Sequence, residues 1–211
     1  MLDVDKTLLV CGLAIGTYLL ASINFSIMLA RLLGKPDPRT VGSKNAGATN
    51  MARVVGKPAA VLVLLLDLAR AFVVIWTTRA LGLEELAPAM ALPLMLGNLF
   101  PAFHRFRGGK GVAAAVGAML AISPPVMLFG GGVFLVVAAL FRRVSIGSIL
   151  MCASYPAWFA LFRGTTAELA TAATIALVVM VTHRRNIARI ARGEEPRIGE
   201  RRQTASSEGD R

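Results

Sequence analysis

Long segments without a single charged residue dominate this sequence and restrict the folds open to it. The first runs from Thr7 to Ala30 and has 24 residues, which is about 36 Å of α-helix. The hydrocarbon core of a bilayer is about 30 Å thick, so this segment is long enough to cross it. The sequence therefore predicts an all-α integral membrane protein.

The composition agrees with this prediction and excludes other classes. The chain has 211 residues, of which 55% are hydrophobic and only 17% are charged, and its mean hydropathy is +0.64. These values exclude a disordered chain and an ordinary soluble domain. The net charge of +11 would suit a nucleic-acid-binding protein, but such a protein would not be this apolar. We expect no nucleic-acid partner.

Six further apolar segments make about seven predicted spans. They are Pro58–Thr78, Leu86–Phe103, Val112–Ile122, Pro124–Phe141, Val144–Phe162 and Thr165–Thr182. The two middle ones form a stretch of 30 uncharged residues interrupted by Ser123, Pro124 and Pro125. Proline ends one helix and starts the next, which favours two helices here. One unsplit, tilted helix would leave six spans.

The basic residues separate cleanly between alternate loops if there are seven spans. Nineteen Lys and Arg residues fall on one side and three on the other, with Arg70 inside a span. Because basic loops remain in the cytoplasm, the N-terminus is predicted outside and the C-terminus inside. Residues 1–199 are expected to form one transmembrane catalytic domain, followed by a polar, disordered tail over residues 200–211.

The first unusual polar stretch is VGSKNAGATNMARVVGK, residues 41–57. It gathers hydroxyl, amide and basic side chains among glycine and alanine, namely Ser43, Lys44, Asn45, Thr49, Asn50 and Arg53. Glycine lets a backbone approach a ligand closely, and these side chains are donors to phosphate. A phosphate-binding loop is the functional interpretation. A solvated basic loop is the alternative.

The second stretch is RFRGGKG, which opens the helix predicted over Val112–Ile122. Gly108, Gly109, Lys110 and Gly111 at a helix N-terminus suit an anion, because free N–H groups and the helix dipole point outward. The spacing is not that of a Walker A loop. Two later stretches, RRVSIGSI and HRRNIARIARGEE, supply Ser145, His183, Asn186 and Glu195. On a continuing helix, His183 and Asn186 would share a face.

Two charged residues, Asp67 and Arg70, lie inside a predicted span at helical i, i+3 spacing. A structural ion pair is the favoured interpretation, because a proton relay would need more carboxylates within the membrane. Nothing indicates a metal or another cofactor, since the two histidines are far apart and no carboxylates are paired. Polar groups pooled on one membrane face predict a pocket for phosphorylated anions.

Four motifs in this order carry a specific resemblance. GSKNAGATNMARVVGK, GNLFPAFHRFRGGKGVAAAVG, RRVSIGSI and HRRNIARIARGEE are similar to those of the bacterial acyl-phosphate:glycerol-3-phosphate acyltransferases, and they cover nearly the whole chain. The resemblance implies a seven-helix enzyme of the bacterial inner membrane with its active site at the cytoplasmic face. It also implies acyl transfer from acyl phosphate to the 1-hydroxyl of glycerol 3-phosphate, giving lysophosphatidic acid and phosphate in the first step of phospholipid synthesis.

The resemblance assigns roles by position. Ser43, His183 and Asn186 are expected to be catalytic. Phosphate binding is expected of Arg53, Lys110, Ser145, Gly108, Gly109 and Gly111, with Asn45, Thr49, Asn50 and Glu195 in support. The chain departs from the family pattern at Lys44, Asn98 and Arg185. Acyl phosphate, glycerol 3-phosphate and membrane lipid are the expected partners of a monomer.

The sequence leaves two alternatives for the mechanism and two for the function. His183 could deprotonate the attacking hydroxyl or only position it. An acyl-enzyme on Ser43 is disfavoured because the chain has no G-x-S-x-G elbow. A transporter or flippase for phosphorylated solutes is the functional alternative, although it would place polar residues along several helices. A non-catalytic scaffold would make no use of the glycine-rich loops.

Overall fold

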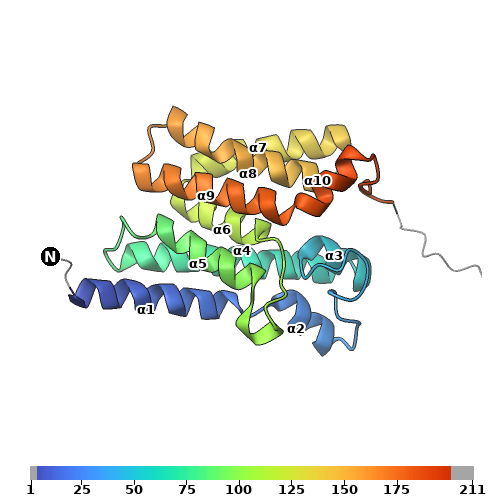
Figure 1. Cartoon of the computed structure of the whole chain (residues 1–211), viewed down its shortest axis with the longest axis horizontal. Coiled ribbons are helices and arrows are strands. Elements are labelled where there is room, and N and C mark those ends of the chain that lie inside the picture. Colours follow the sequence, from blue (N-terminus) through green and yellow to red (C-terminus); the bar gives the residue numbers. More distant parts are fainter. Residues whose placement is uncertain (1–3, 201–211) are drawn as a thin grey trace, which may run out of the picture.

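The computed structural model describes residues 4–200, which are helical with no strand in that range. Figure 1 shows an elongated bundle whose long helices run along one axis. The elements in chain order are α1 Val4–Ala21, α2 Phe25–Leu32, α3 Ala48–Val54, α4 Lys57–Ala80, η1 Pro88–Met90, α5 Ala91–Leu99, η2 Ala102–His104, α6 Val112–Ile122, α7 Pro124–Phe141, α8 Val144–Leu161, α9 Thr166–Thr182 and α10 Arg184–Ala191.

The structure confirms the predicted all-helical fold and contains several apolar helices long enough to cross a membrane. Four segments are long and apolar enough to cross a bilayer: Thr7–Leu32, α4, α7 and α8. The bent pair of α9 and α10 makes a fifth, and α6 is a shorter apolar helix. The outer face of α7 is strongly apolar, with Leu128 exposed at 74% and Leu135 at 67%. Such a face suits lipid rather than water.

The predicted break between the two middle spans is confirmed. α6 ends at Ile122 and α7 begins at Pro124, where the first turn tolerates a residue without an N–H group. Arg79, in the last turn of α4, donates to the C=O groups of Ala121 and Ile122. These carbonyls have no partner within α6, so Arg79 stabilises the end of the helix.

The core forms where small residues let helices approach. α6 packs extensively on α4 and also contacts α7, so it connects the two sides of the bundle. A Cβ atom at Gly117 would lie 2.3 Å from the backbone oxygen of Leu68, so no larger residue fits there. Ala114, Ala115 and Ala118 on α6 are also buried. Close approach through small residues is the usual packing of membrane helices.

Two elements differ from the expected spans. The uncharged segment beginning at Thr7 is not one continuous helix, because α1 stops at Ala21 and α2 starts at Phe25. The Asn24 side chain caps α2 by accepting from the N–H of Ile27 at 3.1 Å. The segment predicted over Leu86–Phe103 has its α-helix only over α5, which ends at Leu99 just before the Phe100–Pro101 pair.

Candidate active site

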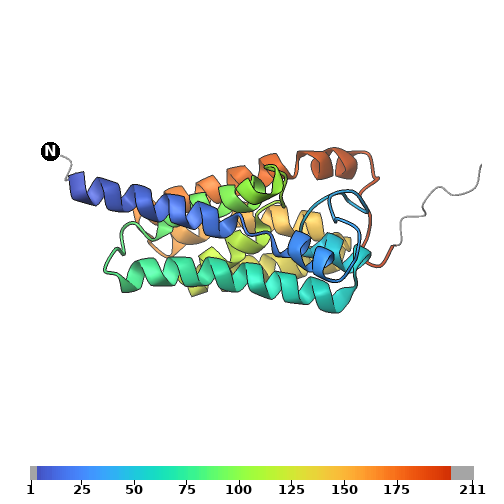
Figure 2. The same cartoon turned by 90° about the horizontal axis from the view of Figure 1, so that it is seen from below.

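The four polar stretches meet at one end of the bundle. Both views place α2, α3 and α10 at this end, opposite the start of α1 (Figures 1 and 2). The loop before α3, the loop before α6, the start of α8 and the junction of α9 with α10 all contribute polar side chains. The sequence expectation that these motifs lie on one side therefore agrees with the structure.

The loop before α3 is built around the side chain of Asn50, which is completely buried. Its Nδ2 donates to the C=O groups of Pro38 at 2.6 Å and Val41 at 3.0 Å, and its Oδ1 accepts from the N–H of Ser43 at 2.8 Å. The backbone at Gly42 has a φ of +62°, and a Cβ there would lie 2.3 Å from Oδ1 of Asn50. Asn50 therefore shapes the loop that presents Ser43.

The other polar residues of this loop and of α3 are less enclosed. Ser43, Thr49 and Arg53 are exposed, and Asn45 is half-buried. Within residues 4–200, the Arg53 guanidinium forms no ion pair. Its charge nevertheless acts on Lys110, so the two cations belong to the same site. An exposed guanidinium beside a second cation is suited to a phosphate group.

Gly108 and Gly109 let their loop pack closely against neighbouring backbone. Their N–H groups donate to the C=O groups of Leu99 and Asn98, both at 3.0 Å. A Cβ at Gly108 would lie 2.0 Å from the backbone oxygen of Asn98, and one at Gly109 would lie 2.9 Å from that of Ala46. Both amides therefore bind the backbone in this structure, and the phosphate binding expected of the two glycines stays a prediction.

Gly111 forms the junction with α6. Its φ is +81°, in the left-handed region that favours glycine, and its C=O accepts from the N–H of Ala115 at 2.8 Å. A Cβ there would lie 2.8 Å from Cδ1 of Leu99. These three glycines together press the loop against the end of α5, which fixes the position of Lys110 between them.

Lys110 is held at both its side chain and its backbone. Its Nζ donates to Oδ1 of Asn186, and its C=O accepts from the Thr182 hydroxyl at 3.2 Å. Burial lowers the pKa of Lys110 to about 8, with Glu195 raising it and the charges of Arg189 and Arg53 lowering it. The ammonium is therefore protonated at neutral pH, but it loses its proton far more readily than an exposed lysine.

Glu195 is the buried acceptor at the centre of this network. Its Oε1 accepts from Ser145 at 2.7 Å and from Nδ2 of Asn186 at 2.6 Å, and its Oε2 accepts from Nε of Arg189 at 2.7 Å. Burial opposes ionisation, but these hydrogen bonds outweigh it and lower the pKa of Glu195. Ser145 was expected to bind phosphate. Its hydroxyl instead donates to this carboxylate.

His183 lies at the junction where α10 turns away from α9 by 61°. α9 and α10 therefore do not form the continuing helix on which His183 and Asn186 would share a face, although both residues are buried at the site. His183 Nδ1 lies 2.8 Å from the C=O of Val179, which can only accept, so Nδ1 carries the proton and Nε2 is the free acceptor. Burial, reinforced by Lys110, lowers the pKa of His183 to about 4, and the ring is neutral at pH 7.

Three residues contribute to the site without having been assigned a role from the sequence, although Arg143 and Arg189 lie within the predicted motifs. Thr182 holds the Lys110 backbone, Arg189 pairs with Glu195, and Arg143 donates from Nε to the C=O of Glu195 at 2.9 Å. Arg189 follows Asn186 by three residues on α10, and that spacing was the one available signal. No group of three or more His, Cys, Asp or Glu within residues 4–200 could hold a metal ion.

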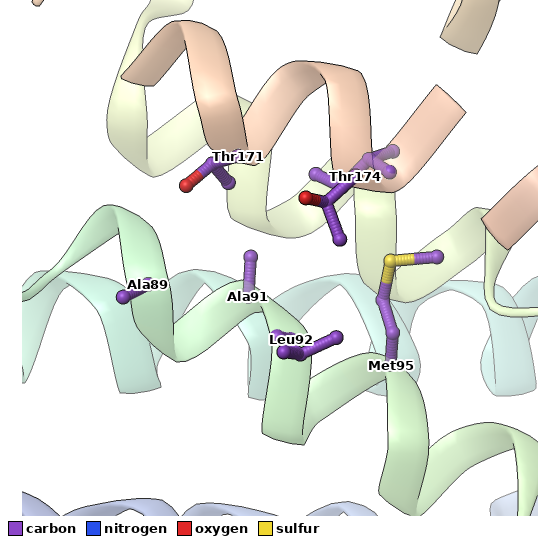
Figure 3. Close-up of a pocket in the computed structure, with 7 residues that line it drawn as sticks. Ala89, Ala91, Leu92, Met95, Thr171 and Thr174 are labelled. Carbon is purple, nitrogen blue, oxygen red and sulfur yellow. The ribbon is translucent and has the colours of Figure 1, made fainter. Parts of the chain in front are cut away.

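A separate apolar pocket lies between α5 and α9 (Figure 3). Its lining consists of Ala89, Ala91, Leu92, Met95, Thr171, Thr174 and Ile175. The Thr174 hydroxyl donates within its own helix, to the C=O of Ala170 at 2.8 Å. The lining contains no titratable side chain, so the polar network around Lys110, and not this pocket, is the candidate active site.

Comparison with known proteins shows what the chain as a whole is similar to. The family model described as glycerol-3-phosphate acyltransferase matches residues 11–193. A glycerol-3-phosphate acyltransferase of Thioalkalivibrio sulfidiphilus is 42% identical over 200 residues, which are 94% of this chain and 98% of the relative. One of Cupriavidus pinatubonensis is 38% identical over 194 residues, covering 90% and 96%.

Two crystal structures of PlsY, an integral membrane glycerol 3-phosphate acyltransferase, have the same fold. The glycerol 3-phosphate form has a TM-score of 0.86 at 36% identity and covers 90% of this chain and 96% of its own. The lysophosphatidic acid form has a TM-score of 0.83 at 35% identity and covers 89% and 94%.

Proposed function

The chain belongs to the glycerol-3-phosphate acyltransferase family, and from this premise we propose that it transfers a fatty acyl group from acyl phosphate to the 1-hydroxyl of glycerol 3-phosphate. The products are lysophosphatidic acid and inorganic phosphate. One observation carries the proposal: the relative with the same fold has been crystallised in a glycerol 3-phosphate form and a lysophosphatidic acid form. These ligands correspond to the acceptor and the product of this reaction.

The site suits a donor that is already activated. An acyl phosphate needs no covalent enzyme intermediate, so the protein has to bind two anions and stabilise the departing phosphate. Lys110 and Arg53 supply the positive charge, and the exposed Ser43 hydroxyl and the Asn186 amide orient the acceptor. The 1-hydroxyl oxygen attacks the acyl carbon, the bond from that carbon to the phosphate oxygen breaks, and phosphate leaves.

The hydroxyl proton is assigned to the departing phosphate. A histidine with a pKa of about 4 is a weak base, whereas its free Nε2 can still accept a hydrogen bond from the attacking hydroxyl. His183 thus positions the acceptor. This assignment needs no acyl-enzyme on Ser43, and it leaves the imidazole neutral throughout the reaction.

We also propose seven membrane spans, formed by α1 with α2, α4, η1 with α5, α6, α7, α8 and α9. α6 is only 11 residues, about 16 Å, and crosses as a short helix surrounded by α4 and α7. The N-terminus lies outside, and the active site lies at the cytoplasmic face of a bacterial inner membrane, because 19 of the basic residues fall on that side. Residues 1–199 act as one monomeric domain, and residue 201 onward lies outside the described range.

Cysteine labelling tests this topology. In a Cys11→Ser background, Glu85→Cys between α4 and η1 should react with an impermeant maleimide from outside intact cells. Arg192→Cys beyond α10 should react only after the membrane is opened. The opposite pattern would invert the proposed orientation.

Phosphate release by the purified protein, with palmitoyl phosphate as donor, tests the reaction. Release is expected only when glycerol 3-phosphate is present, together with formation of lysophosphatidic acid. Arg53→Ala and Lys110→Ala should abolish it, and Lys35→Ala, an exposed lysine after α2, is the matched control. Release without the acceptor would indicate a phosphatase. Uptake of a phosphorylated solute into proteoliposomes without a new lipid would indicate the transporter.

A further inference from the structure

Glu195 connects α8 to α10 and to the segment that follows α10. It accepts from Ser145 on α8, from Asn186 and Arg189 on α10, and it lies on the segment that follows α10. We propose that Arg189 and Ser145 are positioning residues: by holding the Glu195 carboxylate, they orient the Asn186 amide and thereby the Lys110 ammonium. This inference rests on the proposed function.

The chemistry of the partners dictates the orientation of the Asn186 amide. A carboxylate can only accept hydrogen bonds and an ammonium can only donate them. Nδ2 of Asn186 must therefore face Glu195, and Oδ1 must face Lys110, as observed. The reversed amide would place an NH2 group against the ammonium and an oxygen against the carboxylate, losing both bonds.

Arg189 restricts the carboxylate in a way that Ser145 alone cannot. Ser145 and Asn186 both bind Oε1, whereas the Arg189 Nε binds Oε2 at 2.7 Å. With both oxygens bound, the carboxyl group cannot rotate about its terminal bond. Arg189 also places a positive charge beside a carboxylate that is only 7% exposed, which offsets the cost of burying it.

The backbone of Glu195 is tethered independently of its side chain. Nε of Arg143 donates to its C=O at 2.9 Å, and the N–H of Ile198 donates to the C=O of Arg142 at 2.6 Å. The segment after α10 is thus bound to the start of α8. Removing the Arg189 side chain should leave this segment in place and release only the carboxylate.

Among residues 4–200, Asn186 is the one hydrogen-bond partner of the Lys110 side chain, so a shift of the Asn186 amide moves the ammonium. Thr182 binds its backbone oxygen, and Asn186 is the group that binds Nζ. The negative charge of Glu195 also raises the pKa of Lys110 against burial. A carboxylate that rotates away changes both the direction of the ammonium and the pH at which it loses its proton.

The chain offers a matched pair of arginines on and after α10 for the experiment. Arg189→Gln removes the half-buried Arg189–Glu195 pair, and Arg192→Gln removes the exposed Arg192–Glu194 pair at 2.9 Å. We expect Arg189→Gln and Ser145→Ala to lower kcat/KM by about 10- to 100-fold, because a displacement near 1 Å at a reacting site has that effect. Arg192→Gln should stay within about twofold of the wild type.

A double-mutant cycle with Glu195→Gln separates positioning from general damage. If Arg189 acts through Glu195, then Arg189→Gln should have little further effect in the Glu195→Gln background. Glu195→Gln should also move the alkaline limb of the kcat/KM profile to lower pH, because Lys110 loses a nearby negative charge. A structural defect alone would lower the rate without moving this limb. Arg189→Lys keeps the charge and should recover part of the activity.

Three results would overturn the inference. They are equal kcat/KM for Arg189→Gln and Arg192→Gln, additive losses in the cycle, or an alkaline limb that Glu195→Gln does not move. If Arg189→Gln does not fold, the same double-mutant cycle is measured with Ser145→Ala and Glu195→Gln. A wild-type protein that forms no lysophosphatidic acid from palmitoyl phosphate and glycerol 3-phosphate would refute the proposed function itself, which is a different outcome.

Discussion

The buried pair of Asp67 and Arg70 should be the most sensitive polar contact in the transmembrane region. The predicted ion pair is confirmed, with Nη2 of Arg70 2.7 Å from Oδ1 of Asp67 and both side chains under one-tenth exposed. Arg70 also donates to the C=O of Ile23 in the break between α1 and α2, and its guanidinium lies 5.0 Å from the centre of the Phe25 ring. The pair therefore holds the break against α4.

Replacing only one of the two residues should lower the free energy of unfolding strongly, because the other residue is then buried without its partner. Arg70→Met leaves the Asp67 carboxylate and the Ile23 carbonyl without a donor, and breaking a buried pair in this way costs about 3–5 kcal/mol of unfolding free energy. Asp67→Asn keeps an acceptor oxygen for Arg70, so we expect about 1–3 kcal/mol. The double variant carries no unpaired charge and should be more stable than the sum of the single losses predicts, by about 2 kcal/mol.

Unfolding in mixed micelles by increasing sodium dodecyl sulfate, followed by helical circular dichroism, measures these free energies. Ala69→Met, on an exposed position of the same helix, is the control and should change stability by less than about 0.5 kcal/mol. Additive losses in the double variant would refute the reasoning, because they would show that the two side chains contribute independently. An Arg70→Met protein as stable as the wild type would refute it more directly.

Three further predictions concern the active site. kcat/KM should fall as pH rises through about 8, because Lys110 loses the proton that makes it a phosphate ligand; a profile flat to pH 9.5 would contradict this. Gly108→Ala should lower thermal stability and activity together, since its Cβ would lie 2.0 Å from the Asn98 oxygen, whereas Gly132→Ala, with nothing within 4 Å, should change neither. His183→Gln should keep turnover within about tenfold of the wild type with an unchanged pH profile, because a glutamine oxygen can accept the same hydrogen bond; a variant as inactive as His183→Ala would restore the role of general base.

The sequence by itself determined the features that depend on local chemistry. Apolar segments without charges must be helices in a bilayer, because no other structure satisfies their backbone groups within the segment. The interruption at Pro124 followed from the missing N–H group of proline. The gathering of polar motifs on one side followed from the cost of placing such groups in lipid. Family motifs then indicated the proposed reaction without any structural information.

The break between α1 and α2 depended on tertiary structure. The segment is uncharged, and nothing in its sequence indicates a stop at Ala21 or a partner for the freed carbonyl of Ile23. That partner is Arg70, which is 47 residues further along the chain. Because a helix can stop inside a membrane only where its backbone groups find partners, only the packing of α4 against this segment could show that it does.

The functions of individual side chains were likewise decided by distant partners. The family resemblance assigned phosphate binding to Ser145, and the glycines near Lys110 suited an anion at a helix N-terminus. In the structure, Ser145 donates to Glu195, 50 residues away, and the amides of Gly108 and Gly109 bind the end of α5. Lys110 meets Asn186 across 76 residues. A hydroxyl, an amide or an ammonium can serve a ligand or another side chain equally well. The choice is made by what the fold places within hydrogen-bonding distance, and sequence separation carries no information about it.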